Sequence, residues 1–255
     1  PLITGYSDTL ASERQAIATS SATRPRGLDR LIEYRRLLDQ PFRRFSLVGD
    51  TPFFDPARFP WVCTLEENWR VIRTELDAVL ERRAAIPSFQ AVSSRQERLT
   101  QDDRWKVFFL FAYGHKAEKN CRQCPHTTAL LEQVPGMKTA MFSILAPTKH
   151  LPAHQGLYAG VLRYHLGLKV PAQAERCRIR VADHEAHWQE GKSLVFDDTY
   201  DHEVWNDTDE ERVVLFLDVL RPLPIPIDQL NRGILWLAKW MPAVQQVRRN
   251  QDVAF

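Results

Sequence analysis

The order of hydrophobic and polar residues divides the chain into a helical first part, a β-rich middle and a helical tail. Apolar residues recur every three or four positions between residues 64 and 80, where Thr64–Glu67 has the form of a capping box, so one helix is predicted there. A short helix is also expected within residues 28–38. Residues 51–61 indicate a packed irregular segment, and the polar, aperiodic residues 84–104 indicate a loop.

From residue 105 to 222 the pattern changes to short runs in which apolar and polar residues alternate, separated by Pro, Gly and Asp. A period of two is typical of half-buried strands, and several such runs at this spacing predict an antiparallel sandwich or barrel. The expected strands are Trp105–Tyr113, Lys138–Leu145, Val161–Leu168, Arg176–Val181, Lys192–Phe196 and Arg212–Val219.

After Pro222 the helical pattern returns. Its apolar stripe predicts either a helix docked on the β-fold or a helix that lies in a membrane interface. We predict one domain over residues 1–255, with a helical N-terminal layer (1–104), a β-core (105–222) and a helical tail (223–255). The stripe and its aromatic neighbours are Leu230, Ile234, Leu237, Met241, Trp236 and Trp240.

Composition narrows the function only slightly. The chain has 255 residues, 44% of them hydrophobic, which is enough for a substantial core. Its 34 basic and 32 acidic residues nearly cancel and form no block, so a nucleic-acid partner is not expected. No apolar run is long enough to cross a bilayer, and no signal peptide is visible, so a cytoplasmic location is expected. The motif Cys121–Cys124 is a C-x-x-C, for which reduced thiols are favoured over half a zinc site.

Two histidines are candidates for metal binding. His154 follows a proline-rich turn and precedes Gln155-Gly156, and His202 follows the expected strand that ends at Phe196. In a β-sandwich these residues are expected to face one another across the open end. Imidazole suits Fe(II), zinc or copper, and two histidines leave metal positions for substrate and oxygen. The alternative is two ordinary hydrogen-bonded histidines.

Alternation along two strands suggests an anion site. Arg163 and His165 share one strand face, whereas Tyr164 and the neighbouring leucines share the other. Arg212 begins a strand that is otherwise apolar, with Val214 and Phe216 on its own face. A guanidinium group in an apolar interior is costly unless it meets an anion, and a dicarboxylate would bind it in bidentate fashion. The alternative is a solvated arginine at a strand end.

Several motifs resemble the aspartyl/asparaginyl β-hydroxylase family. Upstream segments are more similar to the bacterial lipid A hydroxylase branch of that family. The family-wide motifs are His154-Gln-Gly156, Leu162–Leu168, Cys177–Arg180, Trp188–Lys192 and Phe196–Asn206, and the upstream segments are Pro52–Asp55, Phe59-Pro60, Leu65–Trp69 and Cys124–Leu131.

The resemblance implies a mainly β protein with flanking helices, built on a double-stranded β-helix (jelly-roll or cupin-like), and a dioxygenase that uses Fe(II), 2-oxoglutarate and O₂. It implies that His154 and His202 bind the iron, and that Arg212 holds the far carboxylate of 2-oxoglutarate with help from Ser143. Arg163 is expected to act in catalysis. The remaining residues expected to line the co-substrate pocket, together with Arg163, are Trp105, Tyr164 and His165.

The sequence departs from the family pattern at two positions. Gly156 stands where most such dioxygenases, including the lipid A branch, have the acidic iron ligand of H-x-D. The animal β-hydroxylases also have glycine at this position, and water fills the place of the ligand. Thr128 stands where the animal enzymes have the disulfide partner of the cysteine matching Cys121. Nearby acids at 197, 198 and 201 are expected either to orient His202 or to be solvated loop residues.

Three functions remain open at this point. The first is a dioxygenase that hydroxylates an unactivated C–H bond of a small molecule or peptide and produces succinate and CO₂. The second is a hydroxylase of a lipid A acyl chain at the inner membrane face, with a peripheral membrane contact through the tail. The third is an inactive binding module with the same fold, because Gly156 supplies no ligand.

Overall fold

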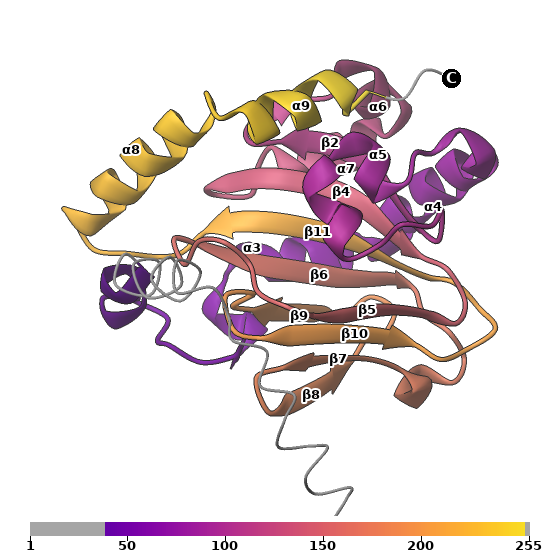
Figure 1. Cartoon of the computed structure of the whole chain (residues 1–255), viewed down its shortest axis with the longest axis horizontal. Helices are drawn as coiled ribbons and strands as arrows, with labels where there is room; N and C mark the ends of the chain where they lie inside the picture. Colours follow the sequence, from indigo (N-terminus) through magenta and orange to yellow (C-terminus); the bar gives the residue numbers. More distant parts are fainter. Residues whose placement is uncertain (1–38, 253–255) are drawn as a thin grey trace, which may run out of the picture. The chain divides into compact units, whose positions relative to one another are not determined.

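A computed structural model describes residues 39–252 of the chain (Figure 1). The chain divides into two compact units, Pro1–Asp39 and Gln40–Phe255, and the second contains every element discussed below. The helix expected within residues 28–38 lies outside the described residues, so the prediction of one domain over the whole chain stays a prediction. The strands are β1 (Phe53–Phe54), β2 (Trp105–Ala112), β3 (His115–Lys116), β4 (Met137–Leu145), β5 (Lys149–His154), β6 (Val161–Lys169), β7 (Cys177–Val181), β8 (His184–His187), β9 (Ser193–Phe196), β10 (His202–Asn206) and β11 (Arg212–Leu220).

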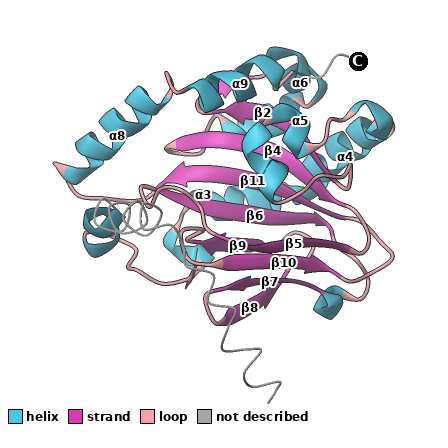
Figure 2. Ribbon diagram, viewed as in Figure 1, coloured by secondary structure: helices cyan, strands magenta, loops and turns pink. Residues whose placement is uncertain are grey.

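Two antiparallel sheets form the centre of the Gln40–Phe255 unit (Figure 2). The major sheet has seven strands in the order β1-β9-β6-β11-β4-β2-β3, and the minor sheet has four in the order β5-β10-β7-β8. Apart from the consecutive pairs β2–β3 and β7–β8, strands that are adjacent in these sheets are not consecutive in the sequence, as in a double-stranded β-helix. The mainly β fold with flanking helices is therefore confirmed, and each of the six expected strands is present to within two residues at its ends.

The period-two pattern separates two cores. The side chains of one face of the major sheet pack against the minor sheet and include Phe196, Val214 and Phe216. Those of the other face pack under the helices and include Tyr164 and Leu215. The interior between the sheets therefore receives the odd-numbered faces of β6 and the even-numbered face of β11, which determines where Arg163, His165 and Arg212 can lie.

The helices before β2 differ from the sequence-based expectation. The predicted single helix is two helices, α3 (Trp61–Glu67) and α4 (Trp69–Leu80), which meet at Asn68. Thr64 lies inside α3, so the predicted capping box is wrong; the Asn68 side chain instead donates to the Thr64 carbonyl (2.8 Å). The predicted loop 84–104 contains three short helices, and the segment 51–61, predicted to be irregular, contains β1 and one short helix. These are η1 (Pro56–Arg58), η2 (Arg83–Ala85), α5 (Phe89–Val92) and η3 (Ser94–Arg98).

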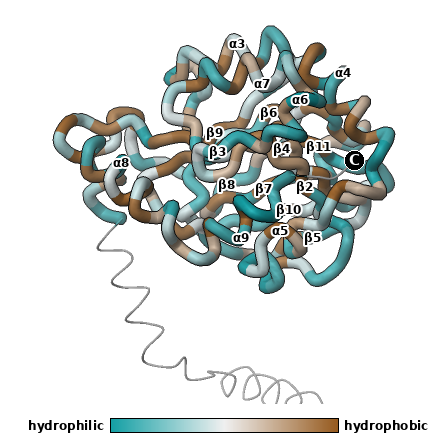
Figure 3. Tube along the Cα trace, turned by 90° about the horizontal axis from the view of Figure 1, so that it is seen from above, coloured by the Kyte–Doolittle hydropathy of each residue, from teal (hydrophilic) through white to brown (hydrophobic). Residues whose placement is uncertain are grey.

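Five further helices follow β3 in the described residues. α6 (Glu118–Gln123) and α7 (Pro125–Leu131) lie between β3 and β4, and η4 (Ala174–Arg176) precedes β7. The tail forms α8 (Ile227–Ala238) and α9 (Pro242–Asn250), and α8 extends away from the sheets in both views (Figures 1 and 3). Within residues 39–252, no helix combines the length and hydrophobicity needed to cross a bilayer.

Candidate active site

His154 and His202 lie side by side in the minor sheet. His154 ends β5, His202 begins β10, and the two residues are directly paired in the antiparallel register. Their ring centroids are 4.0 Å apart. The expectation that they face one another across the open end is therefore wrong: they are neighbours on adjacent strands, and this pairing brings the two imidazoles together.

Both imidazoles are held in a form suited to metal binding. Burial, and then the charge of His202, lower the pKa of His154 to about 4. Burial, and then the Arg163 charge, lower the pKa of His202 to about 4. The Nδ1 atoms lie 2.7 Å from the Pro152 carbonyl oxygen and 3.1 Å from that of Tyr200. With Nδ1–H donating to these carbonyls, Nε2 is the nitrogen that each neutral ring would offer to a metal.

Gly156 lies against a carboxylate from another strand connection. A Cβ atom at position 156 would come within 2.2 Å of the Asp198 carboxylate carbon and both its oxygens. Asp198 is buried, its carbonyl accepts from the Gly156 amide (2.6 Å), and its Oδ2 lies 2.9 Å from Arg163 Nη2. An acid is therefore present beside His154, although it comes from position 198. Of the two expectations for the acid at 198, that of a solvated loop residue is wrong, because Asp198 is buried.

The donor set fits Fe(II) through its histidines alone. Within residues 39–252, no group of three or more His, Cys, Asp and Glu side chains is arranged to hold a metal ion. Asp198 therefore stands near the pair without completing a three-ligand group in this geometry. Two neutral imidazoles on rigid neighbouring strands would still hold Fe(II), with water or co-substrate as the remaining ligands.

Arg212 is a buried cation, and two of its three guanidinium nitrogens lack hydrogen-bond partners among the described residues. Its side chain begins β11, is 2% exposed and lies over the Trp188 ring, with 4.5 Å from the guanidinium carbon to the ring centroid. Among the described residues, neither Nε nor Nη1 has a hydrogen-bond partner. Burial lowers the pKa of Arg212 to about 10, which leaves it charged at neutral pH. A buried, charged guanidinium group with unpartnered donors is suited to binding an anion.

His165 and two neighbours supply further polar groups to this interior. Trp188 Nε1 donates to His165 Nδ1 (3.3 Å), so the His165 proton resides on Nε2, which has no partner in the described chain. Burial, and then the Arg212 charge, lower the His165 pKa well below its usual value, so the ring is neutral. Trp105 Nε1 donates to Ser143 Oγ (3.0 Å), and both residues are buried.

Two predicted site residues have other surroundings. Tyr164 lies on the opposite face of β6, where its ring packs against Trp61 and its hydroxyl accepts from Ser193 Oγ (3.0 Å). The structure therefore does not bring Tyr164 to the pocket, since successive residues of a strand point to opposite faces. Arg163 lies at the histidine end, where Nη2 contacts Asp218 Oδ1 (3.0 Å) as well as Asp198.

The sequence reasoning did not assign Trp188 or Arg221. Arg221 is fully buried and bonds both segments next to the histidine pair: Nε donates to the Ala159 carbonyl (2.6 Å), and Nη2 pairs with buried Asp197. Ala159 follows His154 by five residues and Asp197 precedes His202 by five. The only signal in the sequence was an arginine directly after a long apolar strand.

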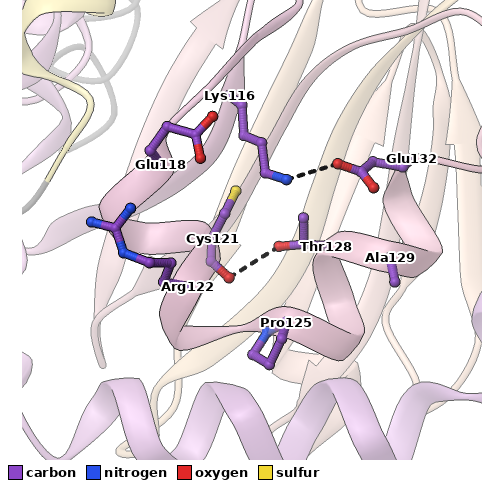
Figure 4. Close-up of a pocket in the computed structure, with 8 residues that line it drawn as sticks. All are labelled: Lys116, Glu118, Cys121, Arg122, Pro125, Thr128, Ala129 and Glu132. Carbon is purple, nitrogen blue, oxygen red and sulfur yellow. Dashed lines mark hydrogen bonds and ion pairs between the residues drawn. The ribbon is translucent and has the colours of Figure 1, made fainter.

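A second pocket lies between α6 and α7, away from these residues. All four cysteines of the chain are free, and Figure 4 shows Thr128 Oγ beside the Cys121 carbonyl oxygen, at 3.4 Å. Burial raises the pKa of both Cys121 and Cys124, so these thiols are poor nucleophiles. The pocket contains no predicted site residue and is lined by Lys116, Glu118, Cys121, Arg122, Pro125, Thr128, Ala129 and Glu132.

Comparison with known proteins gives consistent matches. Residues 66–222 match the family model "Aspartyl/Asparaginyl beta-hydroxylase". The chain is 46% identical over 203 residues to "Ornithine lipid ester-linked acyl 2-hydroxylase" of Rhizobium tropici, covering 80% of this chain and 72% of that protein. It is 36% identical over 166 residues to human "Aspartyl/asparaginyl beta-hydroxylase", covering 63% of this chain but 21% of that protein. It is 29% identical over 184 residues to human "Aspartate beta-hydroxylase domain-containing protein 2", covering 68% of this chain and 48% of that protein.

Proposed function

Because the chain belongs to the aspartyl/asparaginyl β-hydroxylase family, we propose that it is an Fe(II)- and 2-oxoglutarate-dependent hydroxylase whose substrate is an acyl chain of a membrane lipid. The observation that carries the cofactor assignment is the set of partnerless buried donors, Arg212 Nε, Arg212 Nη1 and His165 Nε2, in one apolar interior. A dicarboxylate would supply acceptors for all of them.

The residues divide the work along the interior. Arg212 would bind the far carboxylate of 2-oxoglutarate, and the neutral His165 ring would donate its Nε2–H to the same ligand. The Trp105–Ser143 pair would form the adjacent wall, and the Trp188 ring would keep water from the guanidinium group. His154 and His202 would hold Fe(II) through Nε2, with Arg163 and Asp198 beside them.

When bound, Fe(II) and 2-oxoglutarate would activate O₂, of which one oxygen atom would enter the C–H bond of the substrate and the other would enter the succinate that forms from 2-oxoglutarate with loss of CO₂. The protein provides charge matching, orientation and a dry site. Catalysis needs the co-substrate bound with its keto-acid end toward the histidine pair. Arg212, over the Trp188 ring, would hold one carboxylate, and the other carboxylate with its keto oxygen would then face the histidine pair.

The lipid assignment is supported by the relative that matches most of this chain, which is named for hydroxylation of an ester-linked acyl chain of ornithine lipid. The human relative named for aspartyl/asparaginyl hydroxylation supports a peptide substrate as the second candidate, since it shares 36% identity over 166 residues. The first candidate is favoured because its match covers 80% of the chain rather than 63%.

Turnover with both substrate classes tests the proposal. The protein is incubated with Fe(II), 2-oxoglutarate and oxygen, together with ornithine lipid or with an Asp/Asn-containing peptide, and succinate and the mass of each substrate are measured. We expect succinate release coupled to the gain of one oxygen on the lipid. Gain of oxygen on the peptide alone would replace the lipid assignment, and no succinate with either would contradict the hydroxylase assignment.

A matched pair of histidine variants tests the metal ligands. His154→Ala is expected to abolish coupled turnover, because it removes one of two proposed iron ligands. His150→Ala is the control, since His150 lies on the same strand but is exposed and pairs with Glu203 (2.7 Å). Equal activity of the two variants would contradict the assignment of His154.

A further inference from the structure

The tail carries an exposed apolar surface that the fold does not use. Six of the eleven exposed large hydrophobic residues in the described chain lie between residues 225 and 241. Trp240 is 72% exposed, Leu237 61% and Trp236 58%. We call these residues the α8 apolar face; its members are Ile225, Leu230, Trp236, Leu237, Trp240 and Met241.

This face is distinct from the side of α8 that packs on the body. Ile227 and Ile234 pack against the small core of Phe42, Ala159 and Leu223. Leu230 and Leu237, three residues after Ile227 and Ile234, flank that docked side but are exposed, and Trp236 lies farther round the helix. Gly233 lies among them, and a Cβ there would meet nothing within 4 Å. The helix therefore has a docked side and, beside it, apolar side chains that stay exposed. Figure 3 shows α8 standing apart from the sheets.

Positive charge accompanies the apolar face. The segment from residue 225 to 250 contains four basic residues and one acidic residue. Lys138 lies near this group: burial lowers its pKa, the charges of Arg232 and Lys239 lower it further, and Asp228 opposes them. Trp and Leu on one side of a helix, with Lys and Arg around them, form the pattern of helices that lie in the interface of an anionic bilayer.

α8 is also fastened to the segment that follows His154. The Tyr158 hydroxyl donates to Asn231 Oδ1 (2.8 Å), and Asn231 Nδ2 donates to the Gly160 carbonyl (2.8 Å). Asn231 is fully buried, so these bonds join α8 rigidly to the loop after the proposed iron ligand. Leu157 in this loop is itself exposed. A surface held by α8 thus has a fixed relation to the active site.

We infer that the α8 apolar face docks on the surface of a phospholipid bilayer that contains anionic lipids. The inference rests on the proposed lipid substrate and deepens it: docking would present the mouth of the site to acyl chains in place. A bilayer is favoured over a second copy of this chain because the face combines two exposed tryptophans with a basic surround, and like charges would oppose each other across a symmetric contact.

Vesicle binding tests this docking without turnover. Vesicles of phosphatidylcholine with phosphatidylglycerol are floated with the full chain, with Trp236→Ser/Trp240→Ser, and with the control Val71→Ser. Val71 is 42% exposed but lies on α4, outside the face. We expect the double variant to bind at least about tenfold more weakly than the wild-type chain, since each lost tryptophan removes a large apolar area that docking would bury in the bilayer. The control is expected to bind normally.

Four results would overturn the docking inference. Two concern flotation: equal flotation of all three proteins, or no flotation of any of them. The third is a wild-type protein that is dimeric and does not bind vesicles while the double variant is monomeric. The fourth is fluorescence of the tryptophans that is already protected from acrylamide quenching when no vesicles are present. Binding to phosphatidylcholine alone would overturn the anionic requirement.

A second arm separates this inference from the proposed function. Turnover of a short-chain, water-soluble ornithine lipid is measured beside turnover of the vesicle-embedded lipid. The double variant should keep the first activity and lose most of the second. Vesicle binding by a protein that hydroxylates neither lipid would support docking and contradict the proposed function, whereas equal turnover of embedded lipid by both proteins would contradict docking and leave the function standing.

Discussion

Replacing Arg212 by methionine should stabilise the protein in the absence of 2-oxoglutarate and remove its response to that ligand. Methionine is flexible and apolar enough to fill the space beside Trp188. The substitution removes a buried cation whose Nε and Nη1 have no partner in the described residues. The variant would thus gain stability without ligand but lose its response to 2-oxoglutarate. Replacement of a residue that is important only for packing would not give this combination.

The magnitude follows from the cost of burying the charge. The fall in the Arg212 pKa from 12.5 to about 10 corresponds to roughly 3 kcal/mol against the charged form. Replacement of buried charged groups by apolar ones commonly stabilises proteins by about 1–4 kcal/mol. We therefore expect a gain of about 1–3 kcal/mol, and a melting temperature higher by about 2–4 °C for each kcal/mol.

The ligand response should change in the opposite direction. At a concentration of 2-oxoglutarate about a hundredfold above its Kd, binding would stabilise the wild type by about 2.7 kcal/mol. Thermal unfolding with Fe(II), without oxygen and with or without 2-oxoglutarate, should show this rise for the wild type and none for Arg212→Met. Arg178→Met is a suitable control because Arg178 is only partly buried and pairs with Asp207 (2.9 Å).

Two results would refute this reasoning. Destabilisation by more than about 1 kcal/mol without ligand would show that Arg212 has a structural partner. Full stabilisation of Arg212→Met by 2-oxoglutarate would show that another group binds the carboxylate. Retention of succinate formation by the variant would support the second conclusion independently.

Three further predictions concern the histidine end. The folded-state pKa values of His154 and His202 (about 4) lie below the ordinary 6.5, so between these pH values the unfolded metal-free chain binds more protons than the folded one. The free energy of unfolding, measured by urea titration, should therefore fall by about 2 kcal/mol per histidine from pH 6.5 to 5. A free energy that does not change over this range would contradict the prediction. Gly156→Ala should lower turnover at least about tenfold, because its Cβ would displace the Asp198 carboxylate, and normal kcat would exclude a role for that contact. Arg221→Met should cost about 3–5 kcal/mol, since it removes the buried partner of Asp197 and leaves that acid only a longer ion pair with Arg43 (3.9 Å), and a loss below about 1 kcal/mol in chemical denaturation would show the pair to be dispensable.

The alternation of residues predicted the interior better than motif position did. Period two placed Arg163 and His165 on one face of β6 and Tyr164 on the other, and the structure agrees. The assignment of Tyr164 to the co-substrate pocket came from the resemblance and conflicts with that face. The register of a strand is a local property, so the sequence could predict it.

The histidine end could not be predicted to the same extent, because it depends on strands that carry weak patterns. β5 and β10 hold His154 and His202, yet most of their residues are polar or partly exposed, so no alternation marked them as strands. Asp198 meets Gly156 only after these strands pair. A contact between positions 42 residues apart leaves no periodic signal in either segment.

The two ends of the interior carry opposite formal charge, which would suit the proposed metal at one end and the proposed dianion at the other. Beside the histidine pair, Asp198 and Asp218 share one cation, Arg163, for a sum of −1. Beside Trp188, no carboxylate of residues 39–252 raises the pKa of Arg212, which gives this end a formal charge of +1. Fe(II) would be attracted to the first end and the far carboxylate of 2-oxoglutarate to the second. Both ends of 2-oxoglutarate are carboxylates, so charge alone would draw either of them to Arg212. The keto oxygen beside one carboxylate, as a further ligand for Fe(II), would therefore be what selects the orientation that the proposed catalysis needs.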